Sequence, residues 1–352
     1  MSSCNTTHRS VLTLAASAWL LTSLLYLAGG CAGGGKTAGN DSAINSYVAG
    51  VLAYQKGDSV KAMANLQDAV SKKDDLVMAR SMLGDLYRSK NDYSAAKEQY
   101  EVVARLDPYD YLNHYHLGFV YQLLGELQDA AVSYLKALDL KPTDAPSNMY
   151  LGAVYVALSD SARISPQERM ELRRRAVPYS ERAAEINPNW PDAQANLGKA
   201  LDAVGNYAKA EGAYRKSLDM DSDNTTTRLY LGENLLFQKK FHEARSVFSE
   251  LVKIEDSPLN RKRLGDSYAG ELNFDDAINQ YQAALKLDSL YYPALNEIGR
   301  VYVAQYEQGV ELNADKRKAA IEVWQQSLAI RRSQPDVMAL IQQYSKPKLF
   351  QP

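Results

Sequence analysis

Apolar residues recur with helical spacing along most of the chain after residue 43, and the pattern is clearest between Tyr111 and Pro142. Apolar positions there fall three and four residues apart over two stretches, roughly 111–123 and 127–140. Gly125 separates the stretches and Pro142 follows the second, as expected for a tight turn and a helix stop. The pattern predicts two short amphipathic helices packed against each other.

The same two-helix pattern recurs along the chain in a fixed register. A glycine in the first helix stands at positions 50, 84, 118, 152, 198, 232, 265 and 299. An alanine in the second helix stands at positions 62, 96, 130, 176, 210, 244, 277 and 320. A helix pair of this size cannot bury its apolar faces alone, so eight copies predict a repeat protein in which neighbouring pairs share one core.

The small and aromatic residues of the unit resemble those of the tetratricopeptide repeat. The third copy carries Leu-Gly-x-x-Tyr at 117–121, Ala-x-x-x-Tyr at 130–134, and Pro142. The resemblance implies an all-α fold, a right-handed α-solenoid of eight helix pairs with a concave groove. In each pair the first helix is helix A and the second is helix B. Gly118 and Ala130 would let the two backbones approach closely, with tyrosine rings filling the adjacent space.

Repeats four and eight are longer than the others. From glycine to alanine there are 24 residues in repeat four and 21 in repeat eight, against 12 elsewhere. We therefore expect insertions between helices A and B, near 159–170 and 305–315. In the first insertion, Ser165–Glu168 has the composition of a capped helix start. Pro178 predicts a kink or a restart within the following helix B.

The C-terminal part of the chain predicts an end cap. The eight repeats occupy 43–332, and 333–345 carries a single apolar stripe at helical spacing. A helix with one apolar and one polar face is what the open end of a solenoid requires. We expect a capping helix there, followed by a frayed tail at 346–352.

The first 30 residues have the features of an export signal. Arg9 precedes an uncharged apolar run at 11–27, which is short for a membrane span. The run ends in Leu-Ala-Gly-Gly-Cys at 27–31, which resembles the lipobox of bacterial lipoproteins and implies a lipid on Cys31. Because Cys4 leaves with the signal, Cys31 is the one cysteine of the mature chain. The alternative is a plain secretory signal followed by an unmodified cysteine.

Residues 31–42 are Gly-rich and polar, which predicts a flexible tether between the lipidated cysteine and the repeats. In lipoproteins of bacteria with two membranes, an aspartate after the cysteine commonly signals retention in the inner membrane. Ala32 stands at that position. By this resemblance we expect a lipid anchor in the cell envelope, at the outer membrane and facing the periplasm.

Composition narrows the range of partners and chemistries. The net charge of −2 argues against nucleic acid as a partner. Neither a phosphate-binding glycine loop nor a Gly-x-Ser-x-Gly nucleophile turn is present in the sequence. His114 and His116 are two residues apart on one expected helix, so they point in different directions and suit surface or groove positions rather than a metal site. We expect no catalysis, no cofactor and no bound metal.

Tyrosine is frequent, with 24 copies, and the repeat accounts for many of them. We expect core packing for the tyrosines of two columns, one in helix A and one in helix B. The helix A column contains Tyr87, Tyr121, Tyr155, Tyr268 and Tyr302, and the helix B column contains Tyr100, Tyr134, Tyr214 and Tyr281.

The resemblance also implies where a partner would bind. In this family the positions three before and one after the repeat glycine line the groove. The residues we expect to contact a partner are Tyr47, Val51, Asp85, Tyr115, Phe119, Met149, Lys199, Lys262 and Arg300. Tyr115 and Phe119 have a second interpretation, packing against neighbouring helices, because exposed aromatic residues and core residues cannot be told apart from register alone.

Together these patterns favour a membrane-anchored scaffold or adaptor that binds a protein or peptide segment in the groove, within the bacterial cell envelope. The alternative is a noncatalytic regulatory subunit of an envelope enzyme complex, such as a peptidoglycan hydrolase or a pilus or secretion assembly. A pull-down from solubilised envelope would distinguish them.

Overall fold

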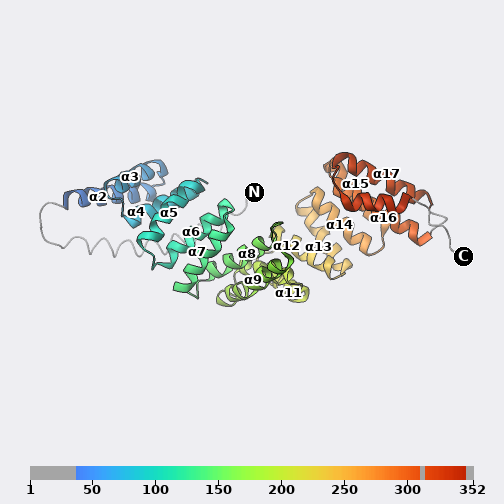
Figure 1. Ribbon diagram of the computed structural model, residues 1–352, viewed down its shortest axis with the longest axis horizontal. Helices are drawn as coiled ribbons and strands as arrows, with labels where there is room; N and C mark the ends of the chain where they lie inside the picture. The colour runs from blue at the N-terminus through green and yellow to red at the C-terminus, as the bar shows by residue number, and fades with distance from the viewer. Residues whose placement is uncertain (1–36, 310–313, 346–352) are drawn as a thin grey trace. The chain divides into compact units, whose positions relative to one another are not determined.

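The computed structural model describes residues 37–309 and 314–345, which form the helices α2–α18, and no strand occurs within these two ranges (Figure 1). The bounds of the first eight helices are α2 Thr37–Gln55, α3 Ser59–Lys72, α4 Val77–Ser89, α5 Tyr93–Leu106, α6 Tyr111–Leu124, α7 Leu127–Leu140, α8 Ala145–Ser159 and α9 Pro166–Ile186. Those of the other nine are α10 Pro191–Ala203, α11 Tyr207–Met220, α12 Thr225–Phe237, α13 Phe241–Ile254, α14 Pro258–Gly270, α15 Phe274–Leu287, α16 Tyr292–Gly309, α17 Ala314–Ile330 and α18 Pro335–Ser345.

The helices pair as the repeat predicts. Helices α2 to α17 form eight pairs of helix A and helix B, and α18 follows the last pair. The all-α fold of eight helix pairs with a C-terminal capping helix is therefore confirmed. Helices α2–α5 form one compact unit and α6–α18 form a second, and each unit is described by itself.

Within the second unit, helices A lie in one row. Each of α6, α8, α10, α12 and α14 contacts the next helix A, whereas each helix B packs between its own helix A and the following one. We call the exposed face of this row, formed by α6, α8, α10, α12, α14 and α16, the helix A surface. The row positions side chains from successive repeats next to one another.

The repeat glycines leave room for aromatic rings of helix B. A Cβ atom on Gly118 would lie 2.9 Å from Cδ1 of Tyr134, and one on Gly232 would lie 2.5 Å from Cζ of Phe248. The predicted core role of the helix B tyrosines is confirmed, since Tyr100, Tyr134, Tyr214 and Tyr281 are at most 1% exposed. In the helix A column Tyr155 is buried, and the other four tyrosines are half-buried.

Repeat four differs from the others in its helix B. Helix α9 begins at the expected capping box, in which Ser165 and Glu168 exchange hydrogen bonds. Of the kink or restart expected at Pro178, the restart does not occur, because α9 continues through this residue as one helix. Buried Ala176 and Ser180 flank the proline and hold both sides of it in the core, which outweighs the lost backbone hydrogen bond.

The N-terminal boundary of the repeats also differs from the expectation. Helix α2 begins at Thr37, so residues 37–42, which we placed in the tether, belong to its first turns. Ala43 is fully buried, and Ser46 donates a hydrogen bond to Asp68 on α3, which holds this end of α2 in the repeat. The expected signal at 1–30, Cys31 and the tail at 346–352 lie outside the described residues.

The C-terminal helix closes the last pair. Val337 and Tyr344 of α18 are buried in one cluster with Trp324 of α17, whose indole N–H donates to the carbonyl of Asn296 at 3.1 Å. The Tyr344 hydroxyl donates to Glu307 at 2.8 Å, which ties α18 to α16. No helix in 37–309 or 314–345 combines the length and the apolar character that crossing a membrane requires.

Candidate functional site

An aromatic cluster lies where α6 and α8 meet on the helix A surface. The ring centroid of Tyr150 lies 6.2 Å from that of Tyr115 and 5.3 Å from that of Phe119. Beneath them, the fully buried ring of Tyr134 stacks on Tyr150 at 5.9 Å. Tyr115, Phe119 and Tyr150 are half-buried. The rings of Tyr115 and Phe119 pack against the core and keep a portion of their surface exposed, so the packing interpretation holds in part and contact with a partner stays a prediction.

Met149 is not a surface residue, contrary to our expectation. It is 3% exposed and packs with Ala183 of α9 and Ala193 of α10. The following residue, Tyr150, takes the half-exposed position instead. A signal for Tyr150 was present in the sequence, since aromatic residues also stand two positions before the repeat glycine at His116 and Tyr230.

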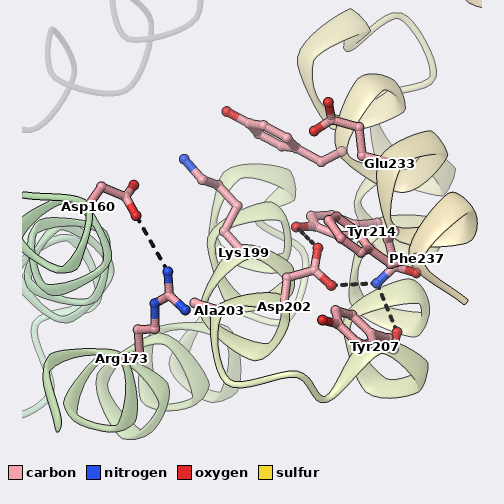
Figure 2. A pocket seen from close by; sticks show the side chains of 11 residues that line it. Asp160, Arg173, Lys199, Asp202, Ala203, Tyr207, Tyr214, Glu233 and Phe237 are labelled. Atoms are coloured by element: carbon pink, nitrogen blue, oxygen red, sulfur yellow. Dashed lines mark hydrogen bonds and ion pairs between the residues drawn. The ribbon is translucent and has the colours of Figure 1, made fainter. Parts of the chain in front are cut away.

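A cleft of about 330 Å³ opens on the helix A surface farther along the unit, between the end of α8 and α12 (Figure 2). Lys199, expected to contact a partner, lies in its wall. The other lining residues were not predicted, and they are Asp160, Arg173, Asp202, Ala203, Tyr207, Tyr214, Tyr230, Glu233, Asn234 and Phe237. They come from the four helices α9–α12 and the α8–α9 loop, so no local sequence motif unites them.

The carboxylates on the α10 and α12 sides of the cleft already have partners within the protein. Asp202 accepts hydrogen bonds from the Tyr214 hydroxyl, at 2.8 Å, and from the side-chain amide of Asn234. Burial raises the pKa of Asp202, and the two hydrogen bonds oppose that shift. Glu233 forms an ion pair with Arg263 of α14. These groups therefore have little capacity left for a ligand.

The cations of the cleft, Lys199 and Arg173, have weaker interactions within the protein than the carboxylates do. The Lys199 ammonium lies 4.9 Å from the ring centroid of Tyr230, and among the described residues no carboxylate lies within 4.0 Å of it. Arg173 donates to Ser159 at 3.3 Å and lies 3.8 Å from the exposed carboxylate of Asp160. Their remaining N–H groups can bind an anionic group that enters the cleft.

An aromatic shelf borders the cleft. The rings of Tyr207 on α11 and Phe237 on α12 stack in parallel, with centroids 5.6 Å apart and an interplanar angle of 3°. Phe237 is 70% exposed, which is unusual for a residue of this size. Figure 2 shows this pair on the opposite side of the cleft from Arg173 and Asp160.

Two other expected contact residues, Lys262 and Arg300, take part in a network of ion pairs between α14 and α16. Lys262 lies 2.8 Å from Asp266 and 3.7 Å from Glu297, and Arg300 lies 3.6 Å from Glu297. Burial raises the pKa of Glu297, and Lys262 counteracts this shift. Lys262 is thus engaged within the protein, while Arg300 remains largely exposed.

The remaining expected contact residues lie in the first unit. Tyr47 and Val51 are half-buried on α2, and Tyr47 packs against the core of that unit, where burial raises the pKa of its hydroxyl. Asp85 accepts hydrogen bonds from Arg88, at 3.0 Å, and from the Tyr100 hydroxyl, at 2.8 Å. Asp85 therefore stabilises its own helix pair.

His114 is buried, which corrects the expectation of a surface or groove position. It is 7% exposed, and its Nε2 lies 2.9 Å from the carbonyl oxygen of Pro108. The side chain thus fixes the chain just before α6. Within the described residues, no group of three or more His, Cys, Asp or Glu side chains has an arrangement suited to a metal ion.

Comparison with known proteins relates this architecture to a family. The family model of the tetratricopeptide repeat matches residues 81–145, 170–259 and 262–309, more than half of the chain. Tetratricopeptide repeat protein 37 of Xenopus laevis is 23% identical over 313 residues, which covers 84% of this chain and 19% of that protein. The human mitochondrial import receptor subunit TOM70 is 19% identical over 237 residues, covering 66% of this chain and 38% of that receptor subunit.

The chain thus spans less than two fifths of the length of these relatives. Among solved structures, the APC/C hetero-tetramer Cut9–Hcn1 superposes with a TM-score of 0.53 at 13% identity, covering 84% of this chain and 55% of that one. At this identity the likeness concerns the fold alone. The family match, together with the eight helix pairs, shows that this chain belongs to the tetratricopeptide repeat family.

Proposed function

We propose that this protein is a membrane-anchored scaffold that holds partner proteins on the helix A surface of its second unit. Tetratricopeptide repeat proteins mediate protein–protein interactions. The observation that carries the proposal is the half-exposed aromatic cluster of Tyr115, Phe119 and Tyr150, supported from below by buried Tyr134. Rigid aromatic side chains give a large contact area at a small loss of conformational entropy, and they dominate the binding energy of many interfaces.

The anchoring part of the proposal rests on the sequence. The apolar run at 11–27 and Cys31 lie ahead of the described helices. Acyl chains on Cys31 would hold the protein at a membrane, because each buried methylene group contributes about 0.8 kcal/mol. By the lipoprotein resemblance, that membrane is the outer membrane of a bacterial envelope, with the repeats facing the periplasm.

The anchor can be tested by replacing the cysteine. Cys31→Ala is expected to abolish lipidation and to release the protein from the membrane fraction, as measured by fractionation and mass spectrometry of the N-terminus. Cys4→Ala is the matched control, since it removes the other cysteine of the chain and is expected to leave lipidation unchanged. An unmodified Cys31 in the wild-type protein, or a mature N-terminus elsewhere, would show that the anchor is wrong.

The aromatic cluster can be tested with the double variant Tyr115→Ala/Phe119→Ala. We expect it to weaken partner binding by about 2 kcal/mol, roughly 30-fold, which is typical of a hot spot. Because both rings also pack against the core, a smaller loss of stability than the ~3–5 kcal/mol for a fully buried phenylalanine should accompany it. The partner is first captured from detergent-solubilised envelope, and its affinity is then measured by titration calorimetry alongside thermal melting.

Tyr109→Ala provides the control for the aromatic cluster, because Tyr109 is 85% exposed and lies in the turn before α6. It is expected to change neither affinity nor melting. Full partner binding by the double variant, combined with a large drop in melting temperature, would assign both rings to the core. Hydrolase activity in the captured complex would instead favour the regulatory-subunit alternative.

A further inference from the structure

The cleft between α8 and α12 exists because repeat four lacks an aromatic contact that later repeats have. Three residues before the repeat alanine of helix B, repeats five and six carry Tyr207 and Phe241. Each packs against the residue five positions after the next repeat glycine. Tyr207 stacks on Phe237, and the ring of Phe241 occupies the space beside Gly270. These contacts join successive repeats.

In repeat four the equivalent residues are Arg173 and Ala203. A guanidinium group and a methyl group replace an aromatic contact, so the space between α9 and α10 stays open and acquires a positive charge. Both residues line the cleft, and Figure 2 shows Arg173 reaching toward Asp160 across its edge. The insertion of repeat four supplies the start of α9, on which Arg173 lies.

Repeat eight shows what an arginine at this position can bind. There the equivalent residue is Arg317, and its Nη1 donates to the carbonyl of Tyr344 at 2.9 Å, at the C-terminal end of α18. Carbonyl groups at a helix C-terminus carry partial negative charge. In the last repeat this arginine therefore holds negatively polarised oxygen atoms of the segment that follows. The corresponding helix beside Arg173 is α10, but Arg173 instead donates to Ser159 and lies 3.8 Å from Asp160.

We propose that the cleft at Arg173 and Lys199 binds an acidic side chain from an extended peptide segment of a partner protein. A neighbouring aromatic or large apolar side chain of that segment then lies on Tyr207 and Phe237. This proposal rests on the proposed scaffold function and assigns the chemistry of one contact on the same helix A surface.

The ligand group is a carboxylate because the acidic residues of the cleft already have partners, whereas its basic residues have few. Asp202 and Glu233 are already paired with groups of the protein. Among the described residues, Lys199 has only its contact with the Tyr230 ring, and Arg173 has one long ion pair, with Asp160, and a hydrogen bond to Ser159. A second positively charged group in the cleft would meet Arg173 and Lys199 and be repelled. An anion adds the carboxylate partner that Lys199 lacks and can receive a further hydrogen bond from Arg173.

The ligand is a peptide segment because of the volume of the cleft and because of the aromatic shelf formed by Tyr207 and Phe237. A volume of about 330 Å³ accommodates one or two side chains but no folded domain. The exposed ring of Phe237 lines the same cleft as the two cations, so a ligand with both a carboxylate and an apolar group uses both features. A small inorganic anion would leave this aromatic surface uncovered.

The test uses the full chain and fluorescent Gly-Ser peptides with blocked ends, each carrying one Glu and one Phe at varied separation. We expect at least one of them to bind, and its affinity to fall as salt is added, since screening weakens charge pairs at a partly exposed site. Replacing Glu by Gln in the peptide, or replacing Arg173 or Lys199 by Gln in the protein, should each weaken binding about tenfold, the loss expected for one charge-assisted hydrogen bond.

A matched control is available for each cation. Arg174→Gln removes an exposed charge adjacent to Arg173, and Lys209→Gln removes an exposed lysine of α11 outside the cleft. Both should leave peptide affinity unchanged, and all four protein variants should melt as the wild type does. Equal losses in the control variants would mean that net charge, not the cleft, attracts the peptide.

The assignment of the cleft would be overturned if no Glu–Phe peptide bound, or if the Gln peptide bound as tightly as the Glu peptide. It would also be overturned if inorganic phosphate competed as well as the unlabelled Glu peptide, or if the protein self-associated at the concentrations used. None of them affects the capture of a partner through Tyr115 and Phe119, so failure of this inference is distinguishable from failure of the proposed function.

Discussion

Phe248→Ala is expected to lower the free energy of unfolding of the second unit by about 3–5 kcal/mol, as for other fully buried aromatic residues. The side chain is 0% exposed and packs with Leu235 and Leu251 in a core cluster of the unit. Its ring fills the space beside Gly232. Because glycine has no side chain, nothing at that position can fill the cavity when the ring is removed. Urea denaturation followed by circular dichroism measures the loss.

The control for this prediction is Phe237→Ala in the same repeat. Phe237 is largely exposed, and its main described ring contact is the stack on Tyr207, so its removal should cost only about 0.5–1.5 kcal/mol. Because each repeat is stabilised by its neighbours, the Phe248 variant should also lose hydrogen-exchange protection in α11 and α14, the helices adjacent to the affected pair. Similar costs for both phenylalanines would contradict the packing described for repeat six.

Gly118→Leu is the second substitution with a large expected effect, a loss of about 1–3 kcal/mol from overpacking. Even the Cβ atom of the new side chain would lie 2.9 Å from the ring of Tyr134. That ring has little freedom to move, because it is fully buried and its hydroxyl donates to Gln122 at 3.0 Å. Thermal melting and urea denaturation should both report the loss.

A second helical glycine gives a matched comparison. Gly212 on α11 is exposed, and a Cβ atom placed on it would meet nothing within 4 Å. Gly212→Leu should therefore leave stability unchanged or raise it by up to about 0.8 kcal/mol, the difference in helix propensity. If Gly118→Leu melted like the wild type, the close approach of α6 to the Tyr134 ring would be in error.

Much of the fold could be predicted because the repeat period acts on every pair of helices in the same way. The register of glycine and alanine places Tyr134, Tyr214 and Tyr281 in the core, where the structure has them. The same register could not separate Met149 from Tyr150, since adjacent residues on a helix differ by only about 100° in direction. Which of the two is exposed depends on how α9 and α10 pack, and that packing is specific to repeat four.

The polar part of the site was harder to predict, because its contacts join different repeats. Lys262 looked like an open cation on α14, yet its second carboxylate partner, Glu297, comes from α16. The cleft likewise combines Arg173 with residues of α10, α11 and α12. The exchange of an aromatic residue for Arg173 was visible in the sequence, but its meaning depends on Ala203, thirty positions later.

The arrangement of helices A and B has a consequence for how the chain folds. In the second unit each described helix contacts helices close to it in the chain, so the mean sequence separation of contacting residues is small. Proteins with such low contact order fold quickly, because little loop entropy is lost before native contacts form. Folding can nucleate at any repeat and spread to its neighbours. A chain that emerges gradually during its synthesis can therefore begin to fold before its last repeat has appeared.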